Sequence, residues 1–168
     1  MEITIRKADA ADLDAVVRVY EHVHDAEEAG PAQVGWVRGV YPVRSTAEAA
    51  LERGDLFVEE ADGAVVGTGI FNRLQADVYA GAPWQYDAPD DQIMVLHTLA
   101  VDPQAGKRGL GRAFAAFYEQ YAREHGCRYL RIVCFSYPAV ALTYLLSNVL
   151  RGTERVRLPL YVSIVTTI

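Results

Sequence analysis

The strongest hydrophobic pattern of the chain lies near its middle. Residues 93–101 contain only two polar side chains, His97 and Thr98, so the run is typical of a strand buried on both faces and is too short to span a membrane. Asp102 and a proline end the run, and a glycine-rich turn over residues 106–112 follows. The turn leads into a helical stripe made of Leu110, Phe114, Phe117 and Tyr121. The pattern therefore predicts a strand, a turn and an amphipathic helix in direct succession.

The segment before residue 55 predicts one strand and two helices. Residues 2–6 alternate apolar and polar side chains, which indicates a half-buried strand. Apolar residues at helical spacing over residues 13–23 predict an amphipathic helix that ends near Gly30. Ser45 and Glu48 have the spacing of a capping box, which places the start of a second helix there.

Strands and helices continue on both sides of the central stretch. Residues 55–60 and 64–72 are strand-like and flank an Asp-Gly pair, which favours an antiparallel hairpin. Residues 129–135 predict a strand after the central helix, so the strand, helix and second strand form a right-handed parallel crossover. Residues 138–150 look helical by composition, and residues 158–168 look like a terminal strand.

Length and composition favour one cytoplasmic globular domain. The chain has 168 residues, of which 51% are hydrophobic, and this is enough for a proper core. Its net charge of −6 argues against nonspecific nucleic-acid binding. The N-terminus has no apolar signal region, and the spacing of Cys127 and Cys134 fits buried thiols better than a metal site or a disulfide. Residues 132–150 lack charges, but Pro138 and scattered polar residues argue against a membrane helix.

The turn at residues 106–112 has the chemistry of an anion site. A strand that feeds a helix through such a turn presents backbone N–H groups and the positive end of the helix dipole. Lys107, Arg108 and Arg112 add positive charge. The sequence therefore predicts a phosphate-bearing ligand at the carboxyl end of a strand, where open α/β sheets bind ligands.

Two other phosphate motifs fit this turn less well. The Walker pattern GxxxxGK[ST] is absent from the chain. A dinucleotide-binding fold places GxGxxG after its first strand, whereas Gly109 and Gly111 follow the fourth expected strand. An ATP-binding or dinucleotide enzyme is therefore kept only as a further alternative.

The order of elements and the stretch LHTLAVDPQAGKRGLGRAF resemble the GNAT superfamily of acyl-CoA-dependent N-acyltransferases. The pyrophosphate motif of that superfamily is Gln/Arg-x-x-Gly-x-Gly/Ala, which places Gly106, Gly109 and Gly111 at its first, fourth and sixth positions. Gly106 departs from the pattern but keeps the backbone N–H. The resemblance implies a single α/β domain over residues 1–168: a mixed, mostly antiparallel sheet with a splayed central parallel strand pair, flanked by about four helices.

The resemblance also implies acetyl-CoA as cosubstrate and a set of residues that bind it. The backbone of the strand would bond the pantetheine arm like an added strand, and the turn would cradle the pyrophosphate. The implied residues are Leu99, Ala100, Val101, Lys107, Arg108, Gly109, Leu110, Gly111 and Arg112. No metal is implied.

Two residues are candidates for proton transfer. His97 alternates with Val95, Leu99 and Val101, so it is expected on their face of the strand, and imidazole can take a proton near neutral pH. A hydrogen-bonded core histidine is the alternative interpretation. The superfamily often uses a tyrosine acid in the helix after the fifth strand; Tyr144 lies one residue from that position, which is about 100° around a helix.

The sequence predicts an N-acetyltransferase that acts on the amine of a small acceptor by direct transfer. An acidic, aromatic loop over residues 77–91 and the segment from Trp36 to Tyr41 are expected walls of the acceptor site, and the loop favours a cationic acceptor. His22 and His24, near the end of the first helix, are expected to be exposed or to interact with the helix dipole rather than to bind metal.

The last 37 residues fit the family pattern poorly. Only four of them, Arg151, Glu154, Arg155 and Arg157, are charged. One interpretation is an apolar tail that packs against a second subunit in a homodimer, and the other is a reading frame that differs from that of relatives. The same departure supports an alternative function, an acyl-CoA-binding sensor or catalytically impaired relative.

Overall fold

A computed structural model describes residues 2–30, 35–75, 84, 88–106, 108–134 and 161–166, with only the backbone for residues 133–134 and 161–166. The strands are β1 (Ile3–Lys7), β2 (Leu56–Ala61), β3 (Ala64–Asn72), β4 (Ile93–Val101), β5 (Tyr129–Cys134) and β6 (Tyr161–Thr166). The helices are α1 (Leu13–Glu28), α2 (Arg44–Arg53) and α3 (Leu110–Glu124), with short 3₁₀ turns η1 (Ala10–Asp12), η3 (Asp90–Gln92) and η4 (Pro103–Ala105).

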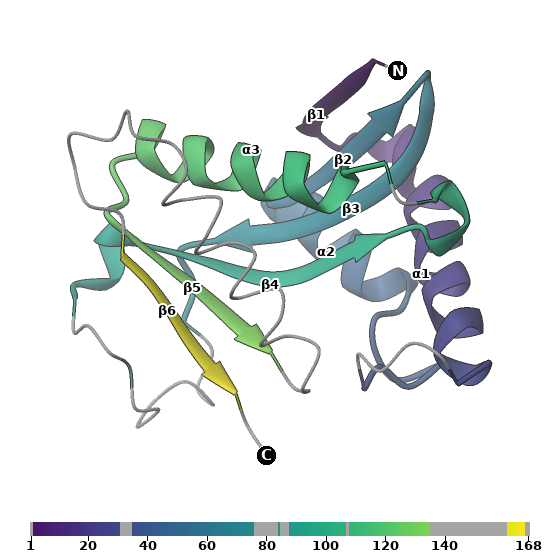
Figure 1. Ribbon diagram of the computed structural model, residues 1–168. Coiled ribbons are helices and arrows are strands. Elements are labelled where there is room, and N and C mark those ends of the chain that lie inside the picture. Colours follow the sequence, from purple (N-terminus) through teal and green to yellow (C-terminus); the bar gives the residue numbers. More distant parts are fainter. Residues whose placement is uncertain are drawn as a thin grey trace.

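The strands form one mixed sheet in the order β1-β2-β3-β4-β5-β6 (Figure 1). The first four strands pair antiparallel, whereas β5 pairs parallel with both β4 and β6. Helix α3 lies on one face, and α1 and α2 lie on the other. The predicted mixed sheet with a central parallel pair is confirmed. The described residues contain three α-helices, and the fourth expected helix falls on residues 138–150, outside them.

A β-bulge in β4 changes which side chains share a face. Ile70 of β3 is opposite Thr98, but the next residue, Phe71, is opposite Leu96, so His97 is the extra residue. Leu96 and Leu99, three positions apart, therefore both pack against the α3-side core. The expected regular alternation of His97 with Leu99 and Val101 is wrong because the bulge inverts the alternation beyond His97.

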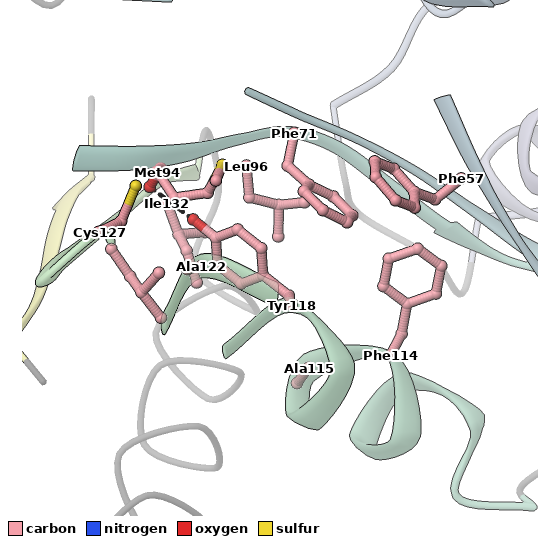
Figure 2. Close-up of a cluster of buried hydrophobic side chains, with 11 residues drawn as sticks. Phe57, Phe71, Met94, Leu96, Phe114, Ala115, Tyr118, Ala122, Cys127 and Ile132 are labelled. Carbon is pink, nitrogen blue, oxygen red and sulfur yellow. Dashed lines mark hydrogen bonds between the residues drawn. The ribbon is translucent and has the colours of Figure 1, made fainter. Parts of the chain in front are cut away.

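The core under α3 is dominated by aromatic rings (Figure 2). Phe57 and Phe71 stack with their centroids 3.9 Å apart, and the edge of Phe114 approaches Phe71. The Tyr118 hydroxyl, fully enclosed, donates a hydrogen bond of 2.6 Å to the carbonyl of Met94. Gly69 makes this packing possible, because a Cβ there would lie only 2.5 Å from the ring of Phe114.

The opposite face of the sheet is covered by an aliphatic cluster. Val16, Val19, Tyr20 and Val23 of α1, with Ala47 and Ala50 of α2, pack on Leu56, Val58, Ile70 and Ala100. The segment between the helices is tied to this layer by His24, which is 1% exposed and whose Nε2 lies 3.0 Å from the carbonyl of Pro42. The expectation that His24 is exposed is therefore wrong.

Several local predictions are confirmed and one cap is displaced. The Asp62-Gly63 pair turns the hairpin with φ angles of 51° and 82°, and Gly54 and Gly126 end α2 and α3 with positive φ. The second helix begins after Val43 rather than at Ser45: the Thr46 hydroxyl accepts the N–H of Val43 at 3.1 Å. Cys127 is a buried free thiol, as expected, and the side chain of Cys134 lies outside the described atoms.

Candidate active site

Strands β4 and β5 are paired over only part of their length. The parallel register runs from Ile93 opposite Tyr129 to Leu96 opposite Ile132, although β4 continues to Val101 (Figure 1). Beyond Leu96, β4 bonds to β3 on one side, and within the described residues no strand pairs with its other side. The backbone of residues 97–101 therefore borders a splay, in which an extended ligand could add its own hydrogen bonds.

The glycine-rich turn closes one end of this splay. Gly106 and Gly109 have φ of 77° and 79°, a region that favours glycine, and a Cβ at either position would meet no described atom within 4 Å. Gly109 caps α3, and its carbonyl accepts the N–H groups of both Arg112 and Ala113 at 3.0 Å. The first N–H groups of the helix have no carbonyl partner within the helix. The turn thus has the open space and the donors that an anion requires.

The turn is anchored to the first helix through Asp102. One carboxylate oxygen of Asp102 accepts the N–H of Gln104 at 2.8 Å, and the other lies 2.9 Å from Nδ1 of His22. The backbone N–H of Asp102 donates to the carbonyl of Val66 at 2.8 Å. His22, expected to be exposed or near the helix dipole, instead pairs with Asp102 and is partly buried. This link holds the end of β4 and the start of the turn in place.

The predicted cofactor residues thus lie along one continuous path. Leu99, Ala100 and Val101 form the end of β4 that extends beyond its pairing with β5, and Gly109, Leu110 and Gly111 form the N-cap and the start of α3. Their neighbours Arg108 and Arg112 are exposed beside the turn. Lys107 lies outside the described residues.

His97 borders a cavity of about 260 Å³ on the other side of β4. The cavity lies between α2, the end of β3 and the middle of β4, and its polar lining residues are Tyr41, Thr46, Arg53, Asn72, His97 and Thr98. Tyr41 reaches it from the segment between α1 and α2: its hydroxyl donates to the carbonyl of His97 at 3.3 Å and hydrogen-bonds Thr98. The expectation that residues 36–41 wall a pocket is confirmed for Tyr41.

Hydrogen bonds on β3 determine the tautomer of His97. The Asn72 amide nitrogen donates to a carboxylate oxygen of Asp55 at 2.8 Å, and this carboxylate, ion-paired with Arg53, can only accept. The Asn72 oxygen must therefore face His97, 2.8 Å from Nε2. Nε2 is then the protonated nitrogen, and the basic lone pair of the neutral ring lies on Nδ1.

Burial lowers the pKa of His97, and the positive charge of Arg53 lowers it further, against a smaller opposing effect of Asp55. The imidazole is consequently neutral at neutral pH, as a proton acceptor must be. Burial also raises the pKa of Tyr41, so that its hydroxyl keeps its proton at neutral pH.

Sequence reasoning did not identify Asn72 or Arg53, and it named Tyr41 only as the end of a segment expected to wall the acceptor site. These three residues come from different parts of the fold and share no sequence motif. Only Tyr41 could be expected from the sequence, because it lies in an aromatic segment between two predicted helices. The predicted acid Tyr144 lies outside the described residues, as do Asp77 and Asp87 of the acidic loop. The described Asp90 and Asp91 are exposed on η3 and do not line the cavity. In the described ranges, no three His, Cys, Asp or Glu side chains gather as metal ligands.

The profile described as "Acetyltransferase (GNAT) family" matches residues 17–143, about three quarters of the chain. The chain belongs to the GNAT acetyltransferase family. This confirms the resemblance seen in the central stretch, and it places the chain among acetyltransferases that use acetyl-CoA.

Several solved structures share this fold. A GNAT-family acetyltransferase from Streptococcus agalactiae aligns with a TM-score of 0.66 and 19% identity over 88% of this chain and 83% of its own. The protein yncA from Salmonella typhimurium, crystallised with its cofactor acetyl-CoA, aligns at 0.59 with 22% identity over 88% and 78%. A ribosomal-protein-alanine N-acetyltransferase from Brucella melitensis aligns at 0.60 with 23% identity over 86% and 82%.

At these identities the likeness concerns the fold alone. No curated protein sequence matches the chain significantly. Among the described helices, none has the length and apolar character needed to cross a membrane.

Proposed function

We propose that this GNAT protein transfers the acetyl group of acetyl-CoA directly to the amine of a small acceptor. The observation that carries the proposal is the position of His97: it follows the last residue of β4 that pairs with β5, at the start of the splay, and its ring borders a separate cavity. A donor bound along the splay and an acceptor bound in the cavity would meet at this residue.

Acetyl-CoA fits the described residues on two counts. The end of β4 at Leu99–Val101, beyond its pairing with β5, offers backbone groups on that side to the amides of the pantetheine arm. The turn from Arg108 to Arg112 offers backbone N–H groups, the helix dipole and two exposed guanidinium groups to the pyrophosphate. We include Lys107 in this binding set on the basis of the sequence.

The proposed reaction needs one base and one acid. The acceptor nitrogen attacks the thioester carbonyl, the new N–C bond forms, and the C–S bond breaks. His97 takes the proton that the amine loses, through Nδ1, while Asn72 holds the ring by Nε2. The thiolate of CoA receives a proton from a tyrosine. Tyr144 is the candidate from the sequence, and Tyr41 is the described tyrosine in the cavity.

The test is a steady-state assay of free CoA thiol with acetyl-CoA and a panel of amines. The proposal predicts thiol release that depends on the amine, with one acetylated product formed for each CoA, and a large loss in His97→Gln. Tyr41→Phe and Tyr144→Phe identify the acid, because removal of the acting hydroxyl lowers kcat most at a pH where the tyrosine keeps its proton, and removes the fall in activity at high pH. Tight CoA binding without turnover across the panel would overturn the proposal and favour an acyl-CoA sensor.

A further inference from the structure

The cavity beside His97 has a positive rather than a negative lining. Among its described lining residues, Arg53 is the one side chain that carries a full charge at neutral pH. None of the described carboxylates lines the cavity: Asp55 is the ion-pair partner of Arg53, and Asp90 and Asp91 are exposed on η3. An acceptor that fits this lining carries negative charge as well as an amine.

Arg53 is oriented for binding an anion. Its Nε donates to Asp55 at 2.8 Å, which fixes the plane of the guanidinium group at the C-terminus of α2. Its two terminal NH₂ groups make no further hydrogen bond with the described residues. This is the edge of a guanidinium that binds a carboxylate through two parallel hydrogen bonds.

A second arginine places positive charge on the same face of the sheet. Leu130 and Ile132 point into the α3-side core, so Arg131 between them points to the His97 side. Arg131 is 8% exposed, donates to Gln75 at 2.7 Å and lies 4.3 Å from the centroid of the Trp84 ring. A buried cation on this face increases the local positive potential.

The charge of Arg53 already acts on His97. Burial has the largest effect on the pKa of the imidazole, and the charge of Arg53 has a larger effect than that of Asp55. Arg53 and His97 also line the same cavity of about 260 Å³. The distance between an anion site and the base is therefore short. A molecule whose carboxylate and amine are separated by one or a few carbon atoms can reach both groups at once.

Resting on the proposed function, we infer that the acceptor is an amino acid or a close relative, whose carboxylate is bound by Arg53 while its amine meets His97. The volume of the cavity suits one such molecule. The sequence favoured a cationic acceptor. An amino acid keeps the cationic amine and adds a carboxylate that compensates its charge.

Matched acceptors test this inference. Thiol release would be measured with the twenty L-amino acids, their primary amides and the corresponding decarboxylated amines. At least one amino acid should exceed its own amide and amine in kcat/KM by about 10- to 100-fold, the effect expected of a charge-assisted bidentate contact. Arg53→Gln should lower kcat/KM for the amino acid much more than for its amide and amine, so that the preference is lost, while Arg53→Lys should restore part of it.

Two controls make the outcome specific. Arg73→Gln removes a nearby charge that borders a neighbouring cavity but not this one, and should keep the preference for the amino acid. Thermal unfolding of each variant shows whether it is folded. Acetylation of amines or amides in preference to every amino acid, or an equal loss for all three classes in Arg53→Gln, would overturn the inference alone. Acetyl-CoA binding without acetylation of any compound would overturn the proposed function itself.

Discussion

The Nε2 atom of His97 lies 2.8 Å from the side-chain oxygen of Asn72, on the neighbouring strand. This contact joins the bulge residue of β4 to the end of β3, and Asp55 fixes the direction in which Asn72 points. The Nε2 atom of the imidazole is therefore held as a donor. Its remaining nitrogen has the basicity that amine deprotonation requires.

Replacement of His97 by glutamine should lower kcat by about 10²- to 10⁴-fold, because glutamine cannot accept the amine proton. The KM for acetyl-CoA should change little, since the substitution leaves the residues of the turn intact. In the wild type, burial and Arg53 lower the pKa of His97, so activity should fall only below the usual histidine pKa of about 6.5. A pH–rate profile checks this. If the activity of His97→Gln fell at low pH in the same way as that of the wild type, a group other than His97 would be the one that titrates.

The two exposed arginines of the turn should contribute to CoA binding through the pyrophosphate. Arg108→Gln and Arg112→Gln should each weaken CoA binding by about two- to fivefold, as expected of exposed charge pairs, and less at high salt. Calorimetry with CoA and with pantetheine, which has no pyrophosphate, measures the effect. Pantetheine binding should be unchanged in both variants, and Arg128→Gln provides a control arginine outside the turn. Equal losses for the two ligands would contradict the assignment of the turn.

Gly69 should tolerate no side chain. Its Cβ would lie 2.5 Å from two ring atoms of Phe114, so Gly69→Ala should lower the free energy of unfolding by about 1–3 kcal/mol. A second substitution, Phe114→Leu, should recover part of that loss in the double variant. Gly111→Ala is the matched control: its Cβ would meet only Val101 at 4.0 Å, and its stability should not fall. Urea unfolding of the wild type and of these variants measures the differences. A Gly69→Ala variant as stable as the wild type would disprove the close packing.

Glu59 should make stability depend on pH. Its side chain is fully buried, neither carboxylate oxygen has a hydrogen-bond partner among the described residues, and burial raises its pKa from 4.5 to about 7. Between these values the folded state holds a proton that the unfolded state has lost. This stabilisation is therefore present at low pH and decreases as pH rises through the window, by an amount on the order of 3 kcal/mol.

Substitution of Glu59 isolates this contribution. Glu59→Met should gain stability relative to the wild type as pH rises from about 4.5 to 7 and then keep a constant advantage. Urea unfolding at several pH values gives the difference. Glu52→Met, at an exposed position of α2, should show no such trend. A difference that does not vary with pH would mean that Glu59 has the same pKa in both states.

Local patterns predicted most of the sheet and the turn, because each depends on neighbouring residues. The apolar run of β4, the Asp62-Gly63 hairpin and the glycines that end α2 and α3 are of this kind. The bulge at His97 was not predictable in this way, since it depends on the register with β3. The His97–Asn72 contact spans 25 residues, and the burial of His24 depends on a carbonyl 18 residues away. Such pairings become visible only when the sheet and helices are assembled.

The central claim is that acetyl-CoA binds in the splay between β4 and β5, with its thioester at His97. A crystal structure of the complex with acetyl-CoA tests this most directly. We expect the pantetheine arm to bond the backbone of Leu99 and Val101, the pyrophosphate to contact residues 106–112, and the thioester to lie within reach of a molecule in the His97 cavity. Acetyl-CoA bound away from the end of β4, or with its thioester separated from that cavity, would contradict the account.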